Sequence, residues 1–97
     1  MEDAMDETQS REEFDTGLKK IRAEAKNRLA LHGLFGTVTC VDSGPTGPVP
    51  DGSRIEIVAK GKTVGRSFDR GQIEGCCLRV GGDVLVGIVA MVDDLSA

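Results

Sequence analysis

A change in hydrophobic period close to Gly33 constrains the fold of this chain more than any other feature. Before Gly33, apolar residues recur every three or four positions, which is the spacing of one stripe along a helix. After Gly33, apolar and polar residues alternate, which is the pattern of half-buried strands. We therefore expect one helix over residues 11–32, followed by a sheet. The stripe consists of Phe14, Leu18, Ile21, Ala25 and Leu29.

Both ends of the expected helix carry recognisable signals. Ser10 followed by Glu13 is the pattern of a capping box, in which each side chain bonds the backbone N–H of the other residue. Gly33 is the expected C-terminal stop, because glycine readily adopts the left-handed conformation that ends a helix. The acidic residues 1–9 are expected to form a disordered tail, so a single domain covers residues 10–97.

Five short strands are expected after the helix, and they cover residues 34–41, 54–60, 62–68, 76–80 and 83–92. Lys60 and Gly61 fit a two-residue turn, and a loop rich in Pro and Gly covers residues 42–53. The last strand is apolar on both faces, with Val86 and Ile88 sharing one of them. It should therefore be central or covered on both sides.

The expected fold is an α+β domain. An N-terminal amphipathic helix is followed by about five short antiparallel strands that form a small β-barrel or a strongly curled sheet. The apolar stripe of the helix is expected to cover one open side of that sheet.

Charge and composition disfavour several functions. The chain has a net charge of -4, three Phe, no Trp and no Tyr, so nucleic-acid binding by phosphate neutralisation or base stacking is not expected. No run of about 18 apolar residues and no signal peptide are present, which makes the cytoplasm the expected location and excludes a membrane. An aliphatic core in 97 residues predicts modest stability, which a partner or a homo-oligomer would relieve.

The adjacent cysteines Cys76 and Cys77 are interpreted as structural residues. Neighbours in a strand point to opposite faces, and only Cys40 and His32 remain as further ligands for a zinc ion, which usually has four. We expect Cys76 in the core and Cys77 outside it, and we interpret His32 as a capping or surface residue. Since no catalytic constellation is present, neither an enzyme nor a cofactor nor a metal is expected.

Three arginines have the clearest chemical use in the sequence. Arg66, Arg70 and Arg79 lie in or beside Gly-rich segments, and guanidinium groups bind phosphate through paired N–H donors. The alternative is that these arginines are solvated and pair with Asp69 and Glu74. Both interpretations are compatible with the sequence.

Two short segments resemble motifs of PilZ domains. RSFDR at residues 66–70 is similar to their Arg-x-x-x-Arg motif, and the DLS of residues 94–96 is similar to the start of their Asp-x-Ser-x-x-Gly motif. The resemblance implies a small β-barrel that binds cyclic di-GMP, with Arg66, Arg70, Asp94 and Ser96 as ligand-binding residues. The glycine that completes the second motif is absent, because the sequence ends at Ala97.

The sequence favours a non-enzymatic module that binds another protein or its own copies, such as an adaptor or a self-associating structural subunit. The expected contact surfaces are the sheet edges, the loop of residues 42–53 and the apolar helix face formed by Phe14, Leu18, Ile21 and Leu29. The alternative is a sensor for cyclic di-GMP or another phosphate ligand that uses Arg66 and Arg70.

Overall fold

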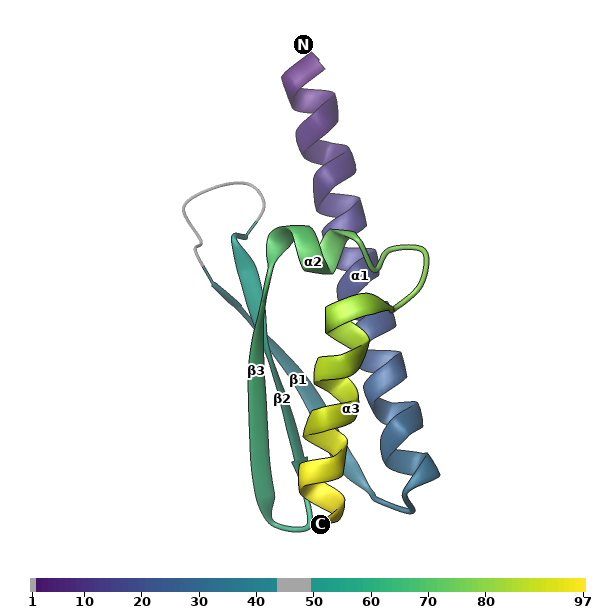
Figure 1. Cartoon of the computed structure of the whole chain (residues 1–97). Helices are drawn as coiled ribbons and strands as arrows, with labels where there is room; N and C mark the ends of the chain where they lie inside the picture. Colours follow the sequence, from purple (N-terminus) through teal and green to yellow (C-terminus); the bar gives the residue numbers. More distant parts are fainter. Residues whose placement is uncertain (1, 44–49) are drawn as a thin grey trace.

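Three helices and a three-stranded sheet make up the chain. The computed structural model describes the backbone of residues 2–43 and 50–97 and the side chains of residues 11–42 and 50–97. The elements are α1 (Glu2–Leu31), β1 (Gly36–Ser43), β2 (Gly52–Ala59), β3 (Lys62–Asp69), α2 (Arg70–Glu74) and α3 (Gly82–Ser96). Helices α1 and α3 lie side by side on one face of the sheet, and the short α2 lies near the start of α3 and against the middle of α1 (Figure 1). The expected α+β class is confirmed.

Helix α1 is longer than the sequence indicated. It begins at Glu2 and continues through Ser10, so residues 2–9 are helical where a disordered tail was expected. Because the helix passes through Ser10, the capping box with Glu13 does not mark its start. Residues 44–49, which belong to the expected Pro- and Gly-rich loop, lie outside the described part of the chain.

The C-terminal end of α1 is built as the sequence predicts. Gly33 has a φ of +68°, and its N–H donates to the carbonyl of Ala30 at 3.0 Å. The N–H of Leu34 donates to the carbonyl of Leu29 at 2.9 Å. These two bonds form a Schellman motif, in which a left-handed glycine satisfies the last carbonyls of the helix. Gly33 is confirmed as the helix stop.

The three strands form an antiparallel meander in the order β1-β2-β3. Lys60 and Gly61 connect β2 to β3 with φ angles of 55° and 73°, and Ala59 pairs with Lys62 directly beyond them. Positive φ at both central residues is the mark of a type I′ turn, whose twist matches that of the strands it joins. The expected two-residue turn is therefore confirmed.

Two of the five expected strands are not strands, and the sheet is not closed into a barrel. Residues 76–80 form an irregular connection between α2 and α3, and residues 83–92 belong to α3. In α3 the buried residues recur at helical spacing, whereas Val86 is 66 % exposed. A sheet with one face to cover needs an amphipathic helix on it, and this packing outweighs the weak strand preference of the Val and Ile residues.

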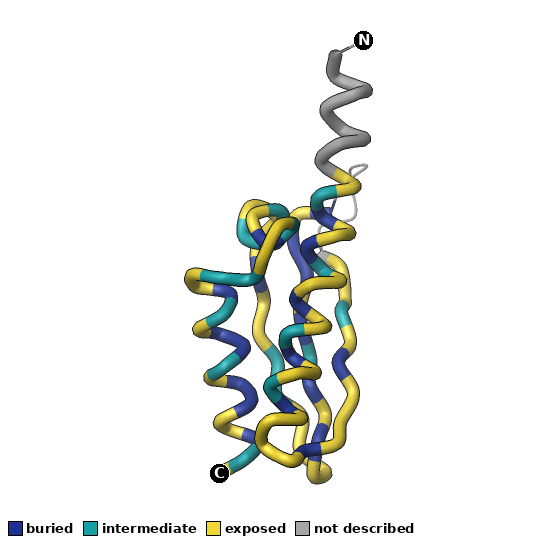
Figure 2. Tube along the Cα trace, turned by 90° about the vertical axis from the view of Figure 1, so that its right-hand side faces the viewer, coloured by how far each residue is buried: buried dark blue, intermediate teal, exposed yellow. Residues whose placement is uncertain are grey.

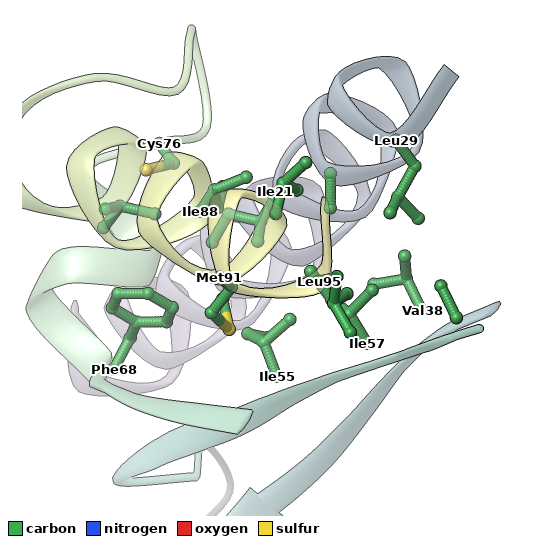
Figure 3. Close-up of a cluster of buried hydrophobic side chains, with 14 of the residues drawn as sticks. Ile21, Leu29, Val38, Ile55, Ile57, Phe68, Cys76, Ile88, Met91 and Leu95 are labelled. Carbon is green, nitrogen blue, oxygen red and sulfur yellow. The ribbon is translucent and has the colours of Figure 1, made fainter. Parts of the chain in front are cut away.

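The hydrophobic core lies between the sheet and the two long helices (Figure 2; Figure 3). On the helix-facing side of the sheet, the stripe of α1 packs on β1, and α3 packs on β2 and β3. The largest fully buried apolar side chains are Phe14, Ile21, Ile55, Ile57, Ile73, Ile88, Leu95 and Val92.

Gly17 lets α2 pack against α1 at backbone distance. A Cβ atom added at Gly17 would overlap the carbonyl oxygen of Ile73 and would lie 2.9 Å from its carbonyl carbon. In a helix, glycine is less favourable than alanine by about 1 kcal/mol. The close approach of α2 explains why the helix tolerates glycine at this position.

Ser53 is the one buried polar residue in the described part of the chain, and its Oγ has no hydrogen-bond partner there. A buried hydroxyl without a partner costs about 1–3 kcal/mol. We therefore expect Ser53→Ala to raise the free energy of unfolding by about 1 kcal/mol, as measured by urea denaturation. Ser67→Ala, at an exposed position of β3, is the matched control and should change little. A clear loss of stability in Ser53→Ala would contradict the prediction.

Candidate functional site

The four α1 residues that the sequence assigned to partner binding lie in the chain's own core. Phe14 and Ile21 are fully buried, Leu29 is nearly so, and Leu18 is partly buried against the same cluster. Their stripe packs on β1 and α3. It holds the fold together and is not exposed to a partner, which corrects the expectation for this helix face.

The side of the sheet that points away from the helices, called the outer face below, has no covering element among the described residues (Figure 1). Outer-face residues alternate with buried residues along each strand. Two of them are aliphatic, Val41 at 55 % exposure and Val58 at 40 %. With their pairing partners, the outer-face residues are Thr37, Thr39, Val41, Gly52, Arg54, Glu56, Val58, Thr63, Gly65, Ser67 and Asp69.

An ion pair occupies the centre of the outer face. Nε of Arg54 lies 3.5 Å from Oε2 of Glu56, and the two side chains are 50 % and 36 % exposed. The Arg54 side chain reaches over β3, since a Cβ atom added at Gly65 would lie 2.8 Å from its Cζ. The remaining charged residue of this face is Asp69, whose carboxylate accepts a hydrogen bond from the N–H of Gln72 and caps α2. The middle of the outer face is therefore neutral overall.

Two large apolar side chains are exposed where α1 leads into β1. Phe35 is 96 % exposed and Leu31 is 77 % exposed. Phe35 also borders a hollow of about 440 Å³ that Leu29 and Leu34 help to line. Large apolar side chains are a mark of contact surfaces where they form a contiguous exposed patch.

The three arginines do not converge on one site. Arg66 lies on the helix-facing side of β3, where its Cδ would be 3.0 Å from a Cβ atom added at Gly87 of α3. Arg70 begins α2, and its Nε lies 3.1 Å from Oε1 of Glu74. This is the pairing expected if the arginines are solvated and pair with nearby carboxylates. Arg79 is exposed in the connection between α2 and α3.

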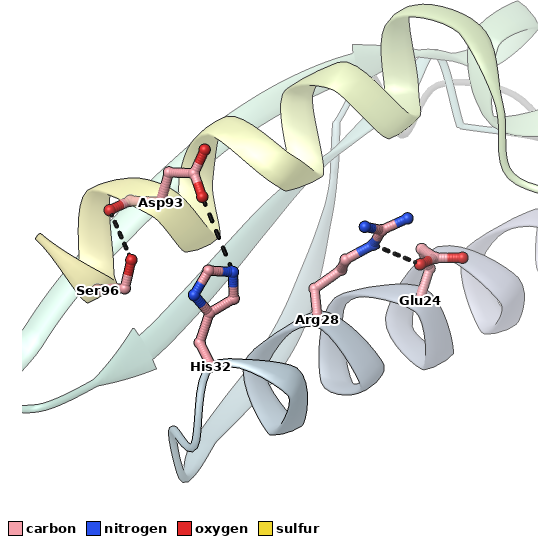
Figure 4. Close-up of polar contacts among 5 residues, drawn as sticks. All are labelled: Glu24, Arg28, His32, Asp93 and Ser96. Atoms are coloured by element: carbon pink, nitrogen blue, oxygen red, sulfur yellow. Dashed lines mark hydrogen bonds and ion pairs between the residues drawn. The ribbon is translucent and has the colours of Figure 1, made fainter.

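Asp94 and Ser96 lie in the last turn of α3, at the end of the molecule away from α2 (Figure 1). Oγ of Ser96 donates to the carbonyl of Asp93 at 3.1 Å, and Nε2 of His32 lies 3.9 Å from Oδ1 of Asp93 (Figure 4). Because Arg70 lies at the opposite end of α3, the structure does not bring the residues of the two PilZ-like motifs together.

Arg79 lies near two lysines of α1 instead. Lys19, Lys20 and Arg79 line a hollow of about 460 Å³ between α1 and the connection that precedes α3. Glu24 lines the same hollow, but its carboxylate is paired with Nε of Arg28 at 2.9 Å (Figure 4). The sequence did not predict this cluster, because the two lysines lie about 60 residues before Arg79 and resemble any solvated helix face.

The two adjacent cysteines differ in environment as expected, although their segment is not a strand. Cys76 is 3 % exposed and Cys77 is half-buried. Burial raises the pKa of the Cys76 thiol, while a hydrogen bond from the backbone N–H of Gly81 acts in the opposite direction. Burial also raises the pKa of Cys40, against the opposing charge of Arg22. Because the thiolate is the reactive form, neither the buried Cys76 nor the half-buried Cys40 is suited to nucleophilic chemistry.

Thiol labelling of the folded protein should follow this order. We expect iodoacetamide to modify Cys77 first and Cys76 last, as measured by pulsed alkylation and peptide mass mapping. Equal labelling rates for Cys76 and Cys77 would contradict the assignment.

The raised pKa also means that the folded state holds the Cys76 proton more tightly than the unfolded state. Its contribution to stability is present below the ordinary thiol pKa of 9.0 and is lost as the pH rises above it.

No three His, Cys, Asp or Glu side chains in the described part of the chain come together as a metal site would require. Among the same residues, no helix combines the length and the apolar character needed to span a membrane. The chain matches no protein-family model, no curated protein and no solved structure.

Proposed function

We propose that this protein is a non-enzymatic interaction module that binds another protein or its own copies through the outer face of the sheet. The observation that supports it most is the asymmetry of the sheet. Its inner face is packed against α1 and α3, whereas Val41 and Val58 stay exposed on the outer face. Covering those side chains would gain hydrophobic free energy, at about 25 cal/mol per Å² of apolar surface.

The exposed Phe35 and Leu31 supply a second apolar surface at the start of β1. Adaptors and structural subunits of assemblies use such surfaces, because aromatic and aliphatic anchors contribute most of the binding free energy. We also propose the cytoplasm as the location, because a reducing compartment keeps free thiols such as those of Cys40, Cys76 and Cys77 unpaired.

Site-specific photo-crosslinking tests the proposal. A photoreactive benzoylphenylalanine is placed at position 58 on the outer face, and at position 86 on the solvent side of α3 as the matched control. Both native side chains are exposed, at 40 % and 66 %. At native expression in its source cells, position 58 should give discrete protein adducts and position 86 should give few. The proposal fails if position 58 forms no adduct, or none beyond those at position 86.

An anion sensor is the second candidate. It is favoured by the position of Arg79 beside Lys19 and Lys20, which places three cations around one hollow with a single, already paired carboxylate. Such a cluster suits a phosphate group, because hydrogen bonds that involve charged groups are stronger than those between neutral groups. The sensor of cyclic di-GMP that Arg66 and Arg70 imply by resemblance to PilZ domains remains a narrower form of this candidate.

Native mass spectrometry with a panel of nucleotides that includes cyclic di-GMP tests the sensor. A stoichiometric adduct that is lost in Arg79→Ala, but kept in Arg66→Ala and Arg70→Ala, would assign the ligand to the hollow on α1. An adduct lost in Arg66→Ala or Arg70→Ala would assign it to the PilZ-like motif. No adduct with any nucleotide would remove this candidate.

A further inference from the structure

The charges at the centre of the outer face are complementary to those of a second copy of the same face. Arg54 and Glu56 stand two positions apart on the central strand, on either side of the level of Ile55. A two-fold axis that lies between two such faces and runs perpendicular to the strands at this level would place each Arg54 opposite the other copy's Glu56. An axis parallel to the strands would place Arg54 against Arg54, and like charges repel.

We propose that the outer face binds a second copy of this chain in the first of these two arrangements. The inference rests on the proposed function and names the partner of the same surface. Self-complementary contacts of this kind are the rule for two-fold dimers, in which one patch meets its own copy. Because the centre of the face carries one positive and one negative charge, it matches itself better than it matches a strongly acidic or basic partner.

The neighbouring strands fit this arrangement. In it, β1 lies over β1 and β3 lies over β3. Thr39 pairs with Glu56 and Val41 pairs with Arg54 in the sheet, so Val41 of one copy lies over Thr39 of the other. On β3 the corresponding residues are the small Gly65 and Ser67, which leave room for two long Arg54 side chains at the roughly 10 Å separation of packed sheets.

The size of the outer face sets the expected strength of the dimer. Three strands spaced at about 4.8 Å, with eight residues that rise about 3.3 Å each, cover about 14 by 26 Å. This is about 360 Å² per copy, or about 700 Å² for two copies, which is below the roughly 1,200 Å² of standard specific interfaces and in the range of weak, transient contacts. We therefore expect a weak dimer, with a dissociation constant in the high-micromolar range or above, as is typical of contacts without large aromatic anchors.

Sedimentation equilibrium of the full chain from micromolar to millimolar concentrations tests the pairing. The parent should show a monomer–dimer equilibrium. Arg54→Glu makes the central pair wholly acidic and Glu56→Arg makes it wholly basic, so each variant alone should dimerise at least about tenfold more weakly. An equimolar mixture of the two variants should recover the dimer, because every positive side chain then faces a negative one. The double variant Arg54→Glu/Glu56→Arg should dimerise like the parent.

Val86→Glu, on the solvent side of α3, is the matched control and should leave dimerisation unchanged. Added salt should weaken the parent dimer by screening the exchanged ion pairs, which gives a test even where a variant fails to fold. A monomeric parent, a salt-independent dimer, or a mixture no more dimeric than its components would overturn the inference. If the parent is monomeric and position 58 still crosslinks to another protein, the proposed function stands and the inference of a dimer fails. If position 58 forms no adduct, the proposed function and the inference of a dimer both fail.

Discussion

Replacing Ile88 by alanine is expected to lower the free energy of unfolding by about 2–5 kcal/mol. Ile88 is fully buried in the core under α3, so the truncated side chain would leave a cavity that the surrounding residues fill only in part. Replacing Val86 by alanine should have the opposite sign. Val86 is 66 % exposed, and alanine is the better helix former by about 0.5 kcal/mol.

This pair of substitutions separates a helix from a strand over residues 83–92. In a strand, positions 86 and 88 would share one face, and both substitutions would lower the stability together. In α3 the two positions lie on different sides of the helix. Urea denaturation measures both changes. The dependence of the unfolding free energy on urea concentration is fitted as one shared value for all variants. Similar losses for Ile88→Ala and Val86→Ala would contradict the helix.

Replacing Gly17 by alanine is expected to lower the free energy of unfolding by about 1–3 kcal/mol. The added methyl group would overlap the carbonyl oxygen of Ile73, and a backbone atom cannot move away by changing a rotamer. Either α2 shifts away from α1 or the fully buried side chain of Ile73 loses part of its packing. This cost opposes, and should exceed, the gain of about 1 kcal/mol that alanine brings to a helix.

Thr16→Ala is the matched control for Gly17→Ala. Thr16 is the preceding residue of α1 and is exposed, so alanine should stabilise the helix there by about 0.5 kcal/mol. Thermal unfolding of the two variants beside the parent should move the midpoint in opposite directions. A midpoint that rises in both would show that α2 does not pack on Gly17.

The parts of the fold that the sequence predicted correctly depend on local chemistry. The stripe of α1 and its stop at Gly33 follow from side-chain spacing and from the conformational freedom of glycine. The turn at Lys60 and Gly61 is short enough that two residues determine its shape. The start of α1 was missed, because an acidic, polar segment is equally compatible with a tail and with the first turns of a helix.

The parts that were missed depend on contacts between distant segments. The run of residues 83–92 is rich in Val and Ile, which suits a strand until a sheet with an uncovered face is available for it to pack on. The sequence of β2 alternates, so Arg54 and Glu56 are expected to share a face opposite to Ile55. That α1 and α3 would both cover the other face could not be read from β2 alone, and so the exposed outer face was not predicted.

The meander of the sheet has a consequence for how fast the chain folds. Each strand pairs with its neighbour in sequence, and only two residues separate β2 from β3, so hairpins of this kind form in about 1–10 μs. The contact between α1 and α3, by contrast, joins His32 to Asp93, and all three strands lie between these two residues in the sequence. Closing so long a loop costs conformational entropy before the native contacts between the helices stabilise it. The sheet should therefore assemble early, and the slow step of folding should be the arrival of α3 beside α1.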